Sequence, residues 1–349
     1  MNLLFDRAPL RVYWELTRAC DLACRHCRAA AVQRRHPDEL TATESLRLLE
    51  QLAAFGDPKP HVVLTGGDPL KRPDLWTIIV AARALGLGVS VAPSATPLLR
   101  GEEIRRLKQF GVEAISLSLD GATPDRHDAL RGIAGTFQRT LDAAQAARAA
   151  ELPFQINTLV AKETLDDLPA IYLLAGRLGA ARWSLFFLVP TGRGAVLEEV
   201  TPDAAEQVMH WLVDLSLQGG SPVVTTTEAP HLRRIMLQRR WSPARSRGAG
   251  IRDGNGIMFI SHTGDVHPSG FLPVTAGNVR TDDVIAIYRD APLFRRLRQP
   301  ELFGGRCGRC EFHAYCGGSR ARAYAASGDP FAEDPLCAYT PRSRARRSP

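Results

Sequence analysis

Long apolar runs are absent from this chain of 349 residues. The first nine residues include Asp6 and Arg7 and lack the apolar core of a signal peptide, so we expect a cytoplasmic protein. Residues 75–99 carry a single charge, but two glycines and Pro93 divide them into a helix, a turn and a strand. We therefore expect no membrane-spanning segment and no membrane partner.

A large excess of positive charge along the main part of the chain is also missing. The formal net charge is +7, but the last eight residues contain four arginines, which leaves +3 for the rest. This balance argues against a nucleic-acid partner. Residues 341–349 combine arginine, serine and proline without an apolar period, so we expect a basic disordered tail there.

Cysteine is scarce and unevenly placed. The chain has seven cysteines, and none lies between Cys27 and Cys307. An odd number of cysteines in a reducing compartment is poorly explained by disulfide bonds and better explained by metal or redox chemistry. Internal repeats and low-complexity segments are absent as well. The two cysteine groups are therefore the first candidates for a functional site.

Short β-branched runs alternate with longer helical patterns through the first half of the chain, which predicts repeated βα units and a parallel sheet. Six such units are too few for an eight-fold barrel but fit a partial (β/α)6 TIM-like barrel, an α/β fold with its site at the carboxyl ends of the strands. The predicted strands are 11–16, 61–65, 88–92, 114–119, 154–160 and 182–188, and the predicted helices are 43–55, 73–85, 102–110, 136–150 and 168–178.

The pattern changes after Pro190. We expect the barrel to occupy residues 9–190, a connecting helix to lie within 191–219, and a small α+β domain to occupy 220–340. Inside this last region, 256–261 and 265–268 flank a turn and predict a hairpin.

The first cysteine group directly follows the first predicted strand. Cys20, Cys24 and Cys27 supply three thiolates, one fewer than a cubane iron-sulfur cluster normally takes, so one iron would stay open for a substrate or cofactor. A zinc site is the alternative, but the nearby His26 adjoins Cys27 and is badly placed as a fourth ligand for the same ion.

The motif C-x3-C-x2-C, placed after the first strand of a partial barrel, resembles the signature of the radical S-adenosylmethionine (SAM) superfamily. The resemblance implies a [4Fe-4S] cluster whose open iron binds SAM, and an enzyme that cleaves SAM reductively. A 5′-deoxyadenosyl radical then takes hydrogen from the substrate. The cofactor carries this chemistry, and the protein provides geometry and excludes water.

Further residues at predicted strand ends match places that bind SAM in this family. The resemblance implies that Gly66 and Gly67 let the backbone approach the methionine end of SAM, and that Asp68 receives its ammonium group. Arg131 resembles the family arginine that pairs with the SAM carboxylate. Read without the resemblance, the glycines are an ordinary turn and Arg131 is an exposed helix residue. The remaining candidates are Ser94, Ser118, Asp120, Asn157 for the ribose, and Phe187 for the adenine.

The second cysteine group consists of Cys307, Cys310, Cys316 and Cys337. Four thiolates complete either a cubane cluster or a zinc site, and spacing does not decide between them. The region resembles the SPASM and twitch extensions of radical SAM enzymes, which bind auxiliary [4Fe-4S] clusters. Ser269 and Arg320 stand where the full SPASM pattern has cysteines. We therefore predict two clusters, one catalytic and one auxiliary.

The resemblance extends to haem-synthesising and haem-modifying members of the family, which remove or oxidise tetrapyrrole propionates. It implies a tetrapyrrole substrate, because Cys20 leaves no room for the N-terminal leader-binding domain of many peptide maturases. Peptide maturation is the alternative, and an iron-sulfur or haem carrier is the non-enzyme alternative. The resemblance also implies an electron donor such as ferredoxin or flavodoxin.

Residues that could contact the substrate lie after the barrel. A basic run could bind propionates, with a solvated face as the alternative; it contains Arg233, Arg234, Arg239 and Arg240. The other candidates sit on predicted strand ends and on the hairpin, with structural roles as the alternative: Thr227, Glu228, His231, His262 and Ser269.

Overall fold

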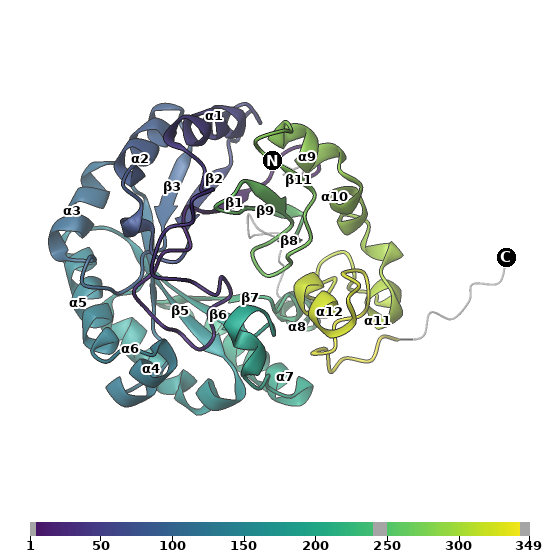
Figure 1. The fold of residues 1–349 in the computed structure, drawn as a ribbon. Coiled ribbons are helices and arrows are strands. Elements are labelled where there is room, and N and C mark those ends of the chain that lie inside the picture. The colour runs from purple at the N-terminus through teal and green to yellow at the C-terminus, as the bar shows by residue number, and fades with distance from the viewer. Residues whose placement is uncertain (1–4, 240–249, 343–349) are drawn as a thin grey trace.

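The computed structural model describes residues 5–239 and 250–342, which form a curved sheet with helices around its outer side (Figure 1). Six neighbouring parallel strands confirm the predicted barrel, which is not closed. Their pairing follows chain order, as expected for successive βα units. These strands are β1 (Arg11–Glu15), β2 (His61–Thr65), β3 (Gly88–Val91), β4 (Ala114–Ser118), β5 (Phe154–Val160) and β6 (Arg182–Phe187).

The sheet continues beyond the six predicted strands on both sides. A seventh strand, β7 (Val223–Thr227), pairs in parallel with β6. The predicted hairpin is present as β9 (Gly256–Ile260) and β10 (Asp265–His267), and β9 pairs in parallel with β1. Two short strands, β8 (Arg252–Asp253) and β11 (Gly277–Asn278), extend this side. Segments expected in the C-terminal domain therefore belong to the same sheet as the barrel.

Helices cover the outer face of the sheet, and their sequences show why they form where they do. The first helix begins with a capping box in which Thr41 and Glu44 satisfy each other's backbone N–H groups, worth about 1 kcal/mol. The covering helices are α1 (Ala42–Ala53), α2 (Leu75–Ala84), α3 (Gly101–Gln109), α5 (Thr136–Ala149), α6 (Leu168–Leu178) and α7 (Pro202–Gln218).

The remaining helices lie at the strand ends or in the C-terminal part. The bounds of most of them were not predicted, although α4 carries one predicted site residue. They are α4 (Pro124–Arg131), α8 (His231–Gln238), α9 (Val284–Asp290), α10 (Pro292–Leu297), α11 (Gly305–Arg309) and α12 (Arg320–Ser327). In Figure 1, α11 and α12 lie beside α8, at the open side of the barrel.

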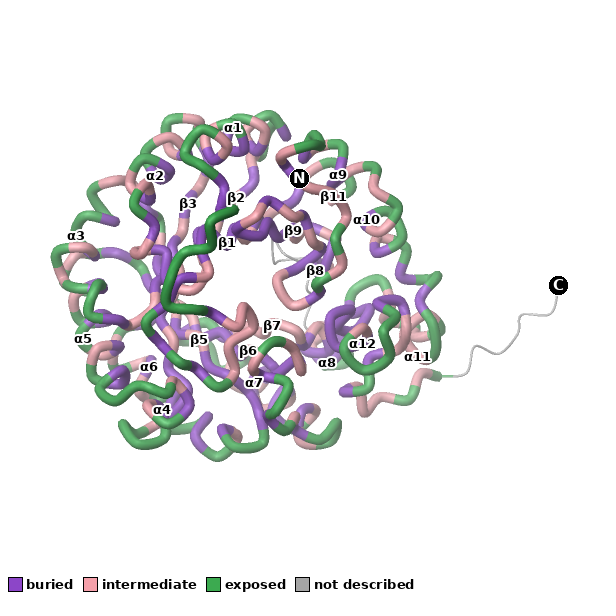
Figure 2. The backbone as a smooth tube through the Cα atoms, viewed as in Figure 1, coloured by how far each residue is buried: buried purple, intermediate pink, exposed green. Residues whose placement is uncertain are grey.

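Alternation along the strands separates the core from the inside of the barrel. In β4, Ile115 and Leu117 belong to the main apolar core, whereas Ser116 and Ser118 line a cavity inside the barrel. Figure 2 shows the same division, with buried strands and helices that expose their outer sides. In β4, the apolar side chains thus pack in the core under the helices, and the serines face the cavity inside the barrel.

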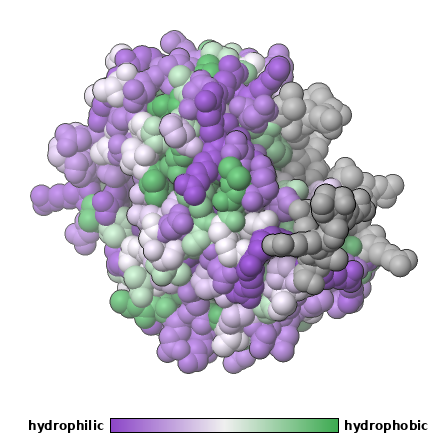
Figure 3. All heavy atoms as spheres, turned by 90° about the vertical axis from the view of Figure 1, so that its right-hand side faces the viewer, coloured by the Kyte–Doolittle hydropathy of each residue, from purple (hydrophilic) through white to green (hydrophobic). Residues whose placement is uncertain are grey.

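The face on the right-hand side of Figure 1 is shown in Figure 3. Its coloured part is mainly hydrophilic, with smaller hydrophobic areas between polar side chains. Among the described residues, no helix has the length and apolar character needed to cross a membrane.

Candidate functional site

A large cavity opens at the carboxyl ends of the strands. It holds about 1210 Å³ of space between protein atoms, a volume that includes its opening to solvent. The predicted site residues that line it come from the loops after β1 to β4, from β4 and β5 themselves, and from α4: Cys20, Cys24, Cys27, Gly66, Gly67, Ser94, Ser118, Asp120, Arg131 and Asn157. The structure therefore brings together most of the predicted catalytic site.

Hydrogen bonds hold the loop with the first three cysteines in place. The N–H groups of Leu22 and Ala31 each donate to a sulfur at 3.4 Å, to Cys20 and Cys27 respectively. Arg131 Nη1 lies 3.7 Å from the third sulfur, that of Cys24. Three free thiols with N–H groups directed at their sulfurs suit an iron-sulfur cluster, whose thiolates accept such bonds.

Gly66 and Gly67 also have a structural role in the loop that carries the first cysteine group. Their absent side chains make room for the start of the cysteine loop: a Cβ on Gly66 would lie 2.3 Å from the carbonyl oxygen of Thr17, and one on Gly67 would lie 2.5 Å from that of Ala19. The N–H of Gly67 donates to Thr17 O at 2.7 Å. The two glycines thus fix the cysteine loop against the loop after β2, besides lining the cavity.

This contact predicts the effect of a single methyl group. We expect Gly67→Ala to lower the free energy of unfolding by about 1–3 kcal/mol, because the new Cβ pushes on backbone atoms that cannot move aside. The amount of iron bound per chain should also decrease in this variant. Denaturation curves and iron analysis measure both effects. Gly101→Ala is the control, since a Cβ there meets its nearest atom at 3.6 Å; equal stability of the two variants would contradict the prediction.

Asp68 is not among the residues that line the cavity, and its role as a partner of the SAM ammonium group stays a prediction. Its carboxylate is fully buried and accepts hydrogen bonds from Thr96 Oγ1 at 2.8 Å and from the N–H of Leu70 at 3.2 Å. Burial raises the pKa of Asp68. The side chain therefore stabilises the turn after β2. Ser94, by contrast, lines the cavity and donates to Gly67 O at 2.7 Å.

Arg131 is not an exposed helix residue, because its guanidinium forms a buried ion pair with Asp120 at the cavity wall. Burial tends to raise the pKa of Asp120, but the charges of Arg131, His26 and His127 and the hydrogen bond from Leu159 together lower it. Asp120 also accepts a hydrogen bond from the N–H of Leu159 at 2.7 Å. The buried Nε of Arg131 has no hydrogen-bond partner among the described residues.

Several cavity residues were not predicted. Arg28 lies in the cysteine loop directly after Cys27, so its position in the motif was an available signal. Arg193 donates from Nε to Cys24 O at 2.9 Å and from Nη1 to Ala31 O at 2.8 Å. Phe186, at the end of β6, and Phe271, after β10, line the cavity with their rings 6.3 Å apart. The place of Phe271 depends on the pairing of β9 with β1, which local sequence does not reveal.

Glu15 holds Arg28 in place at the end of β1. Its two carboxylate oxygens contact Arg28 Nη2 at 2.7 Å and His262 Nδ1 at 2.8 Å. Burial tends to raise the pKa of Glu15, but the charge of Arg28 and the bonds from both partners lower it to about 2. The guanidinium of Arg28 also lies over the ring of Phe259, 4.7 Å from its centroid.

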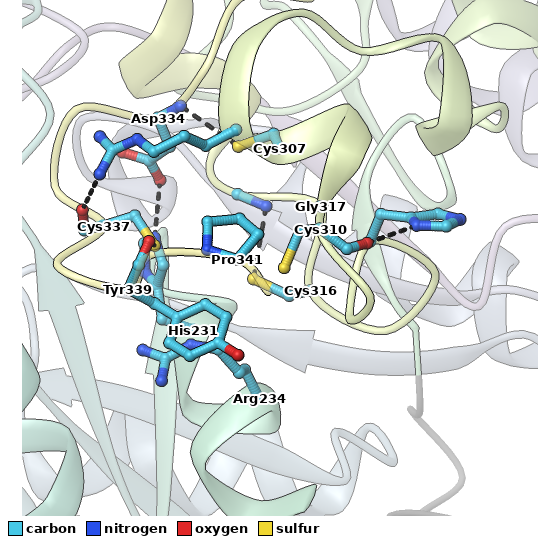
Figure 4. Close-up of a pocket in the computed structure, with 13 residues that line it drawn as sticks. His231, Arg234, Cys307, Cys310, Cys316, Gly317, Asp334, Cys337, Tyr339 and Pro341 are labelled. Carbon is cyan, nitrogen blue, oxygen red and sulfur yellow. Dashed lines mark hydrogen bonds and ion pairs between the residues drawn. The ribbon is translucent and has the colours of Figure 1, made fainter. Parts of the chain in front are cut away.

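The second cysteine group forms a separate pocket in the C-terminal part (Figure 4). All four cysteines are free thiols. The N–H groups of Phe312 and Gly318 donate at 3.5 Å to Cys310 and Cys316, and that of Asp334 donates at 3.4 Å to Cys307. Such donors suit cluster sulfurs here too.

A zinc site would gather its ligands about one ion, with sulfurs at about 2.3 Å. Among the described residues, no three Cys, His, Asp or Glu side chains are gathered in that way. In a cubane, by contrast, each cysteine binds a different iron, so the four sulfurs do not have to surround a single ion.

Residues 14–175 match the family model of the radical SAM superfamily. The chain is 40% identical to the AdoMet-dependent heme synthase of Methanosarcina barkeri (strain Fusaro / DSM 804), over 97% of this chain and 99% of that protein. The chain belongs to the radical SAM superfamily. Members of this family use a [4Fe-4S] cluster and SAM, so the protein is an enzyme with these cofactors.

Two further comparisons place this radical SAM enzyme among related folds. It is 33% identical to the mycofactocin maturase MftC of Mycobacterium ulcerans (strain Agy99), over 95% of this chain and 88% of that one. Its fold is similar to that of Streptococcus suis SuiB bound to the precursor peptide SuiA, with a TM-score of 0.76, 18% identity, and coverage of 95% of this chain and 76% of that chain. The fold is that of SPASM-type radical SAM enzymes.

The residues predicted to contact substrate are mostly placed elsewhere in this radical SAM enzyme. His231 lies in the pocket of the second cysteine group, 3.2 Å from Asp334. His262 is buried against Glu15, and Glu228 is half-buried and accepts a hydrogen bond from Ser319 at 2.5 Å. Burial, together with the charge of Asp253, raises the pKa of Glu228 to about 8. Neither they nor Thr227 and Ser269 line the large cavity.

The basic run does not face the cavity either. Arg234 is buried, forms an ion pair with Glu206, and lies over the ring of Tyr339 in the pocket of the second cysteine group. Arg239 pairs with Asp214, and Arg233 donates to Tyr315 O. Arg240 lies outside the described residues. The described arginines of this run therefore do not line the large cavity, because their partners lie on α7 and in residues 315–339.

Proposed function

We propose that this radical SAM enzyme acts on a carboxylate-bearing tetrapyrrole in haem synthesis. The composition of the cavity carries the proposal. Its wall after β2 to β5 holds the predicted SAM contacts, and its remaining wall combines the aromatic rings of Phe186 and Phe271 with the cation of Arg28. A flat apolar macrocycle with carboxylate side chains requires such a surface. The similarity to a heme synthase over nearly the whole chain supports the same conclusion.

The cofactors and the protein have separate tasks in this proposal. With one electron from a donor, the bound cluster and SAM would supply the radical chemistry that removes hydrogen from the substrate. Cys20, Cys24 and Cys27 would hold the cluster, and Ser118, Arg131 and Asn157 would orient SAM. The second cysteine group would hold an auxiliary [4Fe-4S] cluster. We further propose a cytoplasmic location and an electron donor of the ferredoxin or flavodoxin class.

Arg28 provides the test of substrate class. We expect Arg28→Gln to weaken binding of coproporphyrin about ten- to a hundredfold, because a charge-assisted hydrogen bond to a carboxylate contributes about 1.5–3 kcal/mol. Titration followed by visible absorbance measures the affinity. Arg28→Lys should retain part of it, because the charge remains beside Glu15.

Arg239→Gln is the matched control for this titration. That arginine also pairs with a carboxylate, that of Asp214, but it lies outside the cavity, so its loss should leave the affinity unchanged. Equal affinities of the Arg28→Gln and parent proteins would contradict the assignment of Arg28.

Peptide maturation is the second candidate function, favoured by the similarity to mycofactocin maturase MftC. Absence of coproporphyrin binding by the parent protein, together with modification of a precursor peptide encoded by a neighbouring gene, would establish it in place of the first.

A further inference from the structure

Arg320 is a buried cation in contact with the second cysteine group. It is the first residue of α12, four positions after Cys316, and none of its surface is exposed. Its Nη2 lies 3.5 Å from the sulfur of Cys307. Nη1 donates to the carbonyl oxygens of Pro330 at 3.1 Å and Ala332 at 2.6 Å. The backbone thus anchors the guanidinium on one side, and its other side faces a cysteine sulfur.

No carboxylate within the described residues forms an ion pair with this arginine, which distinguishes it from its neighbour. Arg322, two positions further along α12, is equally buried but pairs with Glu199 at 2.7 Å and Asp334 at 3.5 Å. The charge of the buried Asp253 interacts with Arg320 without forming an ion pair with it, and an anion in direct contact with the guanidinium would offset more of the cost of its burial. Four cysteine thiolates around a [4Fe-4S] core would provide that anion at Cys307.

The chain leaves room for this contact at Gly318. A Cβ on Gly318 would lie 2.6 Å from Arg320 Nη2 and 2.9 Å from the sulfur of Cys307, and its φ of +66° disfavours other residues. The ring of Phe303 covers the guanidinium, 4.5 Å from its centroid. Backbone, ring and glycine together hold the positive charge against one sulfur.

We propose that Arg320 raises the reduction potential of the auxiliary cluster through its contact with the sulfur of Cys307. A fixed positive charge and an N–H···S hydrogen bond both stabilise the reduced cluster, which carries one more negative charge than the oxidised one. This inference rests on the proposed auxiliary cluster. It gives a role to the arginine that stands where the SPASM pattern has a further cysteine.

The experiment measures the potential of the auxiliary cluster alone. In full-length protein with Cys20, Cys24 and Cys27 changed to alanine, only this cluster contributes to the low-temperature EPR signal during a redox titration. We expect Arg320→Met to shift the midpoint potential to more negative values, and Arg320→Lys, which keeps the charge, to shift it less.

Arg298→Met is the matched control. Arg298 also donates to backbone carbonyl oxygens, those of Gly254, Tyr288 and Arg289, but its hydrogen bonds include none to a sulfur. Its replacement removes a comparable anchor and should leave the potential unchanged.

Each outcome decides the question. An unchanged potential in Arg320→Met with full iron content overturns the proposal. If that variant loses its cluster, Arg320→Gln is measured in its place, and a parent-like potential overturns the proposal equally. If both neutral variants lose the cluster and Arg320→Lys keeps it, the result supports an interaction between the positive charge at position 320 and the cluster. Loss of the cluster in all three variants overturns the proposal. Zinc bound to the parent at these cysteines would refute the auxiliary cluster itself, which is a separate result.

Discussion

Replacing Cys24 with alanine is expected to abolish the reductive cleavage of SAM. Only three thiolates line the large cavity, so none can be lost without opening a second iron of the cluster. Arg131 would also lose the sulfur that lies 3.7 Å from its Nη1. After anaerobic reconstitution and addition of dithionite and SAM, we expect no 5′-deoxyadenosine above background by chromatography.

A cysteine of the other group provides the control. Cys310→Ala leaves the three cysteines of the cavity intact, so slow formation of 5′-deoxyadenosine should persist. If the Cys24→Ala protein still cleaved SAM at the parent rate, the assignment of the catalytic cluster would be wrong.

Replacing Cys307, Cys310, Cys316 and Cys337 together is expected to remove half of the bound iron. Seven thiolates divide into three and four, and Ser269 and Arg320 are not usual ligands, so fully reconstituted protein should hold about eight irons per chain. The fourfold variant should hold about four and still bind SAM at the remaining cluster. Metal analysis and EPR spectroscopy measure both properties.

Metal analysis of the parent protein could contradict the prediction of two clusters in two ways. About four irons with one zinc would identify the second cysteine group as a zinc site, and about twelve irons would require ligands other than the seven cysteines.

The six central strands could be predicted because each is specified by its own residues. In β2, Val62 and Leu64 are buried in the core, and this alternation is visible in the sequence. The partners of β7 and β9 could not be predicted in the same way. Arg11 of β1 pairs with Ile257 of β9, and no local pattern links residues so far apart in the chain.

The candidate site also contains residues whose place could be predicted from local sequence and residues whose place depends on distant contacts. The motif around Cys20 predicted the cavity residues that follow successive strands, since parallel strands bring their carboxyl ends together. Substrate residues after β6 were misplaced, because their positions depend on how α8 and the hairpin dock. For Asp68, the sequence indicated the loop but not the direction of the side chain. That direction depends on the hydrogen bond from Thr96, which comes from another loop.

The pairing of β9 with β1 joins the segment that leads to the second cysteine group to the same sheet that carries the first. Strand β1 leads directly into the catalytic cysteine loop, and its far side is occupied by β9 along Arg11 to Trp14. A chain cut near residue 220 would leave that side of β1 as an exposed edge, ready to pair with other molecules. The C-terminal region is therefore no detachable accessory, and loss of its order should pass through β1 to the cavity.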